Sequence, residues 1–83
     1  MFDISNKKIL LTGGASGIGK SLAEGLSKAD ALVTCLDIKK PKNYKGVDHI
    51  KCDLNQISSI DLALKQYIKM NKCPDVLINC AGI

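Results

Sequence analysis

The stretch Thr12–Gly19, with the sequence TGGASGIG, constrains the fold of this chain more than any other. It follows the apolar run Ile9–Leu11 and opens a segment with helical periodicity, so it predicts a strand, a glycine-rich turn and a helix in that order. Glycines let backbone amides approach an anion without a Cβ in the way, and the first amides of a helix have no partner within the helix. The stretch therefore predicts a phosphate cradle in a nucleotide-binding domain.

The size and composition of the chain limit the kind of protein that can contain this cradle. The chain has 83 residues, enough for one small domain, and 46% of them are hydrophobic, which is ordinary for a soluble globular protein. No apolar run approaches the about 18 residues of a membrane span. The N-terminal segment Met1–Ile4 carries an acid where a secretion signal would be basic. We therefore expect a cytoplasmic protein with no membrane partner.

The charged residues and cysteines exclude several further classes of function. The net charge is +4 and every cation is a lysine, so bidentate arginine contacts with phosphate or guanine are excluded. The lysine-rich segment 39–45 contains one aromatic residue, Tyr44, too few for a base-stacking platform, and we interpret it as a solvated loop with no nucleic-acid partner. No two cysteines have metal-ligand spacing, so we expect packed thiols and no metal site. The cysteines are Cys35, Cys52, Cys73 and Cys80.

Hydrophobic periodicity predicts an alternation of strands and helices. The expected strands are Lys8–Thr12, Leu32–Asp37, His49–Asp53 and Val76–Asn79, and the expected helices are Gly17–Ala29 and Asn55–Met70. Each helix is expected to bury one apolar stripe: Ile18, Leu22, Leu26 and Ala29 in the first, and Ile57, Ile60, Leu64 and Ile68 in the second.

This order of elements predicts an α/β fold with a parallel sheet and a helix on each face. Right-handed crossovers then give the strand order 3-2-1-4, which is a partial Rossmann arrangement within a doubly wound parallel sheet. The polar–apolar alternation of 49–53 suits an edge strand. Strands 1 and 4 flank the point where the strand order reverses, so the loops at 13–19 and 79–82 are expected to line one crevice.

Two phosphate-binding motifs fit the glycine-rich stretch. Residues 14–21, GASGIGKS, satisfy the P-loop pattern of an ATP-binding phosphotransferase, in which Lys20 reaches the terminal phosphates and Ser21 binds magnesium. A dinucleotide explains more of the sequence, because Asp37 ends the second strand 18 residues after the last loop glycine. A carboxylate at about that distance accepts hydrogen bonds from the adenosine ribose.

Three motifs in order resemble the short-chain dehydrogenase/reductase family over essentially the whole chain. The family's Thr-Gly-x-x-x-Gly-x-Gly is matched at 12–19 and its Asp-[Leu/Val] at Asp53-Leu54. Its Asn-Asn-Ala-Gly is matched at 79–82, with Cys80 in place of the second Asn. The resemblance implies that residues 1–83 are the N-terminal half of a dinucleotide-binding domain. It further implies an oxidoreductase that exchanges hydride between NAD and a small-molecule alcohol or carbonyl substrate, in a homo-oligomeric parent.

The resemblance also implies the cofactor contacts, which span the carboxyl edge of the sheet. The acid at Asp37 would repel a 2′-phosphate, so we expect NAD as the cofactor. NADP is the less favoured alternative, which stays open because Lys39 and Lys40 lie close by in the sequence and could attract that phosphate. The pyrophosphate turn is implied to involve Gly13, Ser16, Gly17, Ile18 and Gly19, the adenosine to contact Asp37, Asp53 and Leu54, and the central part of the cofactor to contact Asn79, Ala81 and Gly82.

The catalytic residues of that family have no counterpart in these 83 residues. The family uses a Ser and a Tyr-x-x-x-Lys pair, but Tyr44 and Tyr67 are followed at that spacing by Asp48 and Asn71. The apolar strand at 76–79 also suits a sheet interior, whereas within this chain it would lie at an edge. We therefore expect a fragment that ends before the catalytic region and is inactive alone. A non-catalytic nucleotide-binding remnant is the alternative.

Overall fold

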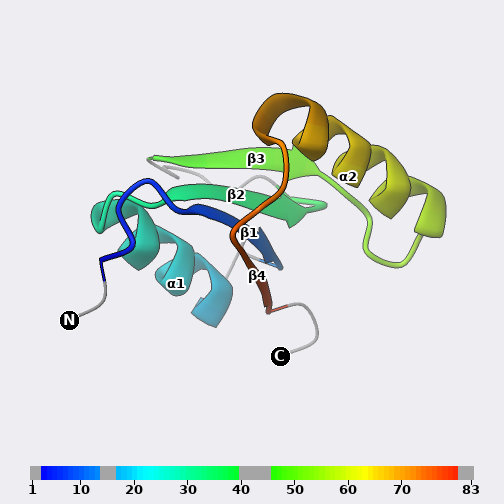
Figure 1. The fold of residues 1–83 in the computed structure, drawn as a ribbon. Coiled ribbons are helices and arrows are strands. Elements are labelled where there is room, and N and C mark those ends of the chain that lie inside the picture. The colour runs from blue at the N-terminus through cyan, green and yellow to red at the C-terminus, as the bar shows by residue number, and fades with distance from the viewer. Residues whose placement is uncertain (1–2, 14–16, 40–45, 81–83) are drawn as a thin grey trace.

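A computed structural model describes residues 3–13, 17–39 and 46–80, and the structural statements below refer to these residues. The elements follow in the order β1 (Lys8–Thr12), α1 (Gly17–Lys28), β2 (Leu32–Asp37), β3 (Val47–Lys51), α2 (Ile57–Asn71) and β4 (Val76–Asn79). The strands form one parallel sheet in the order β3-β2-β1-β4, with the helices on opposite faces (Figure 1). The predicted fold, strand order and edge position of β3 are confirmed.

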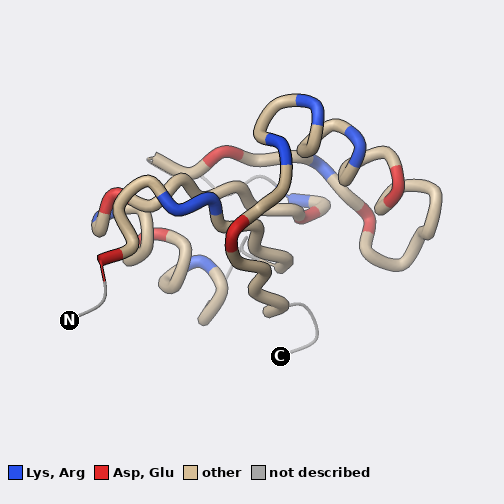
Figure 2. The backbone as a smooth tube through the Cα atoms, viewed as in Figure 1, with Lys and Arg blue, Asp and Glu red and all other residues tan. Residues whose placement is uncertain are grey.

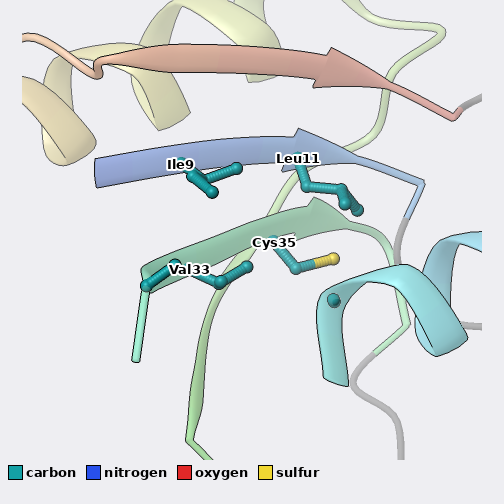
Figure 3. Packing of buried hydrophobic residues seen from close by; sticks show 6 residues of the cluster. Ile9, Leu11, Val33 and Cys35 are labelled. Atoms are coloured by element: carbon teal, nitrogen blue, oxygen red, sulfur yellow. The ribbon is translucent and has the colours of Figure 1, made fainter. Parts of the chain in front are cut away.

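Alternation along the central strands divides the core into two clusters. Ile9 and Leu11 of β1 and Val33 and Cys35 of β2 lie on the α1 face, where Ala23 packs against them (Figure 3). The intervening residues face α2. Strands buried on both faces have continuous apolar sequences, which is why β1 and β2 were recognisable. The second cluster consists of Leu10, Leu36, Ile50, Cys52, Ala63 and Tyr67.

The helix α1 buries a different stripe from the one predicted. Gly19 and Ala23 are buried against the sheet and Leu26 is half-buried, whereas Ile18 is 66% exposed. Small side chains allow the helix axis to approach the sheet closely. Apolar periodicity gives most weight to large side chains, so the predicted stripe lies about one residue earlier in the sequence than the stripe that is buried.

The predicted stripe of α2 is also largely wrong. Ala63 and Tyr67 are the buried residues, and of the predicted stripe only Ile60 is half-buried. Ile57 is 86% exposed. Leu64 lines an open apolar groove, because α2 covers the β2–β3 side of the sheet and leaves the side of β4 uncovered. Among the described residues, no helix has the length and apolar character needed to cross a membrane.

The starts of two elements differ from the prediction, and the ends of α1, β3 and α2 differ from it by one or two residues. The third strand begins two residues early, at Val47, where Gly46 with φ of 73° turns the chain into the sheet and its carbonyl accepts a 3.0 Å bond from Ser27 Oγ. The second helix begins late, at Ile57, because Asp53 Oδ1 accepts the amide of Asn55 at 2.9 Å and holds a turn. The predicted solvated loop at 40–45 lies outside the described residues.

Candidate cofactor site

The carboxyl end of β1 is hydrogen-bonded to both of its neighbours. Gly13 N donates to Leu36 O of β2 at 3.0 Å, and Cys80 N donates to Thr12 O at 2.9 Å on the β4 side. The Thr12 hydroxyl also donates to Asn79 Oδ1 at 2.7 Å. These bonds hold the start of the glycine-rich turn between the ends of β2 and β4, at the point where the strand order reverses. Ligands bind outside such points in open α/β sheets.

Two glycines of the turn have backbone conformations that L side chains rarely adopt. Gly13 has φ of 76° and Gly17, the first residue of α1, has φ of 59°. A Cβ built on Gly17 would have no atom within 4 Å, so the requirement for glycine comes from the backbone and not from crowding. Gly19 serves another purpose, because it is buried where α1 meets the sheet. Ser16 lies outside the described residues.

Asp37 lies at the same edge of the sheet, next to the residue that receives the Gly13 amide. Its carboxylate Oδ1 accepts a hydrogen bond from Lys39 N at 3.1 Å. Its backbone carbonyl accepts one from Cys52 N at 3.0 Å and contacts His49 Nε2 at 2.9 Å. The side chain is half-buried. The carboxylate is therefore held at the end of β2, which lies beside the end of β1.

Of the remaining predicted residues, Leu54 and Asn79 line the groove beside α2. Leu54 is half-buried and lines an apolar groove of about 390 Å³, together with Thr12, Leu77 and Asn79. Asp53 is half-buried, and its amide donates to Ser59 Oγ at 2.9 Å. Ile18, predicted as a contact, is exposed at the start of α1, and Ala81 and Gly82 lie outside the described residues.

Sequence reasoning missed the contacts that hold these side chains. His49 was interpreted only as a polar position of an edge strand, and no sequence pattern indicates its backbone partner. The hydrogen bond of Thr12 to Asn79 was also missed, although both residues were noted in motifs. In the described part of the chain, lysines lie in both helices, at the start of β1, at the end of β3 and between elements, and do not gather in one place (Figure 2).

Comparison with known proteins decides the family. The sequence profile of the short chain dehydrogenase family matches residues 7–83. The chain belongs to this family. Because the chain is a short chain dehydrogenase, we do not retain the alternative of a P-loop, in which Lys20 and Ser21 would bind ATP and magnesium.

Several individual short chain dehydrogenases are similar to the chain. It is 33% identical to the NAD-dependent glycerol dehydrogenase of Listeria innocua, over 99% of this chain and 35% of that relative. A short chain dehydrogenase from Leptospira borgpetersenii, crystallised with bound NAD+, matches 98% of this chain and 33% of its own with a TM-score of 0.87 and 36% identity. The aldohexose dehydrogenase of Thermoplasma acidophilum matches with a TM-score of 0.89 and 32% identity, over 98% of this chain and 31% of its own. The chain thus spans about a third of the length of these relatives.

Proposed function

We propose that this chain is the cofactor-binding part of an NAD-dependent short chain dehydrogenase. The whole protein would exchange hydride between NAD and an alcohol or carbonyl substrate, with residues 1–83 forming the N-terminal half of its dinucleotide-binding domain. The observation that carries the proposal is the position of Asp37, one residue beyond the Leu36 carbonyl that binds the Gly13 amide. This position supports a carboxylate that would bind the ribose close to the amides that would bind the pyrophosphate.

The residues present fit a dinucleotide. The first amides of α1 have no partner within the helix, and Gly17, which has no side chain, leaves their approach open. Asp37 would accept the ribose hydroxyls and repel a 2′-phosphate, while Leu54, which follows β3, offers an apolar side chain for the adenine. Bound there, NAD supplies the hydride chemistry, and these residues supply position and selectivity. Two similar proteins, named or crystallised with NAD, support this choice of cofactor.

The cofactor proposal is tested by titrating the protein with NAD and NADP in a calorimeter. We expect tighter binding of NAD, and we expect Asp37→Ala to narrow the preference by about tenfold or more, because hydrogen bonds to a charged group contribute about 1.5–3 kcal/mol. Asp61→Asn is the matched control, since Asp61 is an exposed acid of α2 paired with Lys65. A preference that survives Asp37→Ala would show that the ribose lies elsewhere. Absence of NAD binding would refute the proposal itself.

The same proposal predicts that these 83 residues bind cofactor without turning it over. Neither tyrosine has the lysine partner that lowers the pKa of a catalytic tyrosine in this family. Tyr67, moreover, is 1% exposed in the core beneath α2. We expect no NADH production from alcohols by the purified chain, measured by absorbance. Steady NADH production proportional to protein concentration would contradict this expectation.

A further inference from the structure

His49 is placed to hold the end of β2 from the edge strand. It stands opposite Cys35 in the β2–β3 register, and Lys51 stands opposite Asp37. Paired residues of parallel strands face the same side, so the His49 ring lies on the α1 face, which is also the face of the Asp37 side chain. From there the ring reaches diagonally to the Asp37 carbonyl, with an Nε2–O distance of 2.9 Å.

The chemistry of this contact determines which ring nitrogen of His49 carries a hydrogen. A backbone carbonyl only accepts, so the ring nitrogen must donate, and the neutral imidazole carries its hydrogen on Nε2. The same carbonyl accepts the Cys52 amide at 3.0 Å. Both lone pairs of this oxygen are therefore used by β3 and the residue after it. The peptide unit that follows Asp37 is held through its carbonyl, while the Lys39 amide holds Oδ1 of the Asp37 side chain.

We propose that His49 is a positioning residue for cofactor selection, which keeps the Asp37 carboxylate where it distinguishes NAD from NADP. This inference rests on the proposed ribose-binding role of Asp37. Without the imidazole donor the Asp37 carbonyl keeps the Cys52 amide but loses one hydrogen bond, so the peptide after Asp37, and with it the carboxylate, is held less firmly. The consequence is specific: the preference between the two cofactors falls, because only NADP carries a 2′-phosphate near that carboxylate.

A first test needs no cofactor. His49 is the only histidine, so its imidazole nitrogens give one assignable set of signals in a proton–nitrogen NMR spectrum. We expect the neutral ring to be the Nε2–H tautomer. We also expect the Lys39 amide, bound to Asp37 Oδ1, to exchange its proton faster in His49→Leu than in the wild type. A neutral ring that carries its hydrogen on Nδ1, or a Lys39 amide whose exchange is unchanged in His49→Leu, would overturn the inference.

The second test measures the ratio of the NADP and NAD dissociation constants. We expect His49→Leu to reduce this ratio by about fivefold, the size of one net hydrogen bond, and His49→Gln, whose amide nitrogen replaces Nε2 as a donor, to restore it. Val47→Ala is the control, since Val47 packs on the same face of β3 without a polar partner there, and should leave the ratio unchanged. In an Asp37→Ala background, His49→Leu should have no further effect on the ratio.

The outcomes separate this inference from the cofactor proposal. If the wild type prefers NAD and His49→Leu weakens both cofactors equally, the histidine is merely structural and the inference fails while the proposed function stands. An Asp37→Ala background in which His49→Leu still changes the ratio would also overturn it, because the two residues would then act independently. If the wild type binds no NAD, the proposed function fails and the inference with it.

Discussion

At the scale of single residues, the backbone decides which side chains are tolerated. Gly17 adopts φ of 59° at the start of α1 and has open space around its Cβ position, whereas Gly25 lies within the same helix without a positive φ. The two glycines therefore have opposite effects on the stability of the fold. Glycine is required at the first and is a cost at the second.

We expect Gly17→Ala to lower the free energy of unfolding by about 1 kcal/mol, because a left-handed conformation costs an L residue about 1–2 kcal/mol. Gly25→Ala is the matched control and should raise it by about 0.5–1 kcal/mol, since alanine favours the helix and nothing lies within 4 Å of its Cβ. Urea unfolding followed by circular dichroism measures both. Two changes of the same sign would contradict the described start of α1.

Burial also changes the chemistry of one residue in the core. Loss of solvation raises the pKa of Tyr67, and the nearby Asp75 carboxylate raises it further. In the unfolded chain the phenol ionises near pH 10. The stability that this group contributes is therefore complete below about pH 10 and is lost as the pH rises through its higher folded value.

The Tyr44→Phe variant leaves Tyr67 as the only tyrosine, so phenolate absorbance reports on it alone. We expect a titration midpoint above about 10 in the folded protein, falling to the ordinary value in urea. Tyr67→Phe should correspondingly flatten the alkaline part of the stability profile. A folded midpoint equal to that in urea would mean that the ring is not buried.

At the scale of elements, small residues decide how α1 meets the sheet. Ala23 is completely buried against Leu11 and Cys35, and Gly19 precedes it by one turn. The apolar periodicity of the sequence predicted that α1 exists and where it begins. The periodicity selected the wrong face of α1, because Ile18 and Leu22 are larger than the residues that fit between the helix and the sheet.

We expect Ala23→Leu to lower the free energy of unfolding by about 1–3 kcal/mol, since added methylenes overpack a filled core. Ser21→Leu adds similar bulk at an exposed position of the same helix and should change stability by less than about 0.5 kcal/mol. Thermal and chemical unfolding compare the two. Equal effects would indicate that α1 does not bury the face described here.

Strands were more predictable than helix faces. The ranges of β1, β2 and β4 agree with the prediction residue by residue, because strands within a parallel sheet are short apolar runs bounded by turns. The third strand was displaced because the conformation of Gly46 and its contact with Ser27 are tertiary features. Within the candidate site, Gly13 and Asp37 were predicted from spacing, whereas the His49 contact was not.

At the scale of the whole molecule, α2 covers only part of its face of the sheet. The uncovered part is the apolar groove of about 390 Å³ lined by Leu10, Leu64 and Leu77. Leu77 is 65% exposed on β4, which is an edge strand in the described sheet. An apolar edge strand is a site of association.

We expect Leu77→Lys to reduce concentration-dependent association of the purified chain, because it places a charge on that strand. Leu62→Lys is the control, since Leu62 is 68% exposed on α2 and does not line the groove. Sedimentation velocity at increasing protein concentration measures the effect. Equal reductions by both variants would show that net charge, and not the β4 edge, controls association.

The sequence by itself determined the order of elements, the parallel sheet, the family and the residues that stand at strand ends, because periodicity, glycine spacing and the rules of crossover are local properties of the chain. Only the tertiary structure decided which face of each helix is buried, where β3 begins and which groups hold Asp37 in place. Those outcomes depend on contacts between residues far apart in the sequence, such as the imidazole of His49 and the end of β2. Contacts of that kind are set by tertiary packing, and no local sequence pattern predicts them.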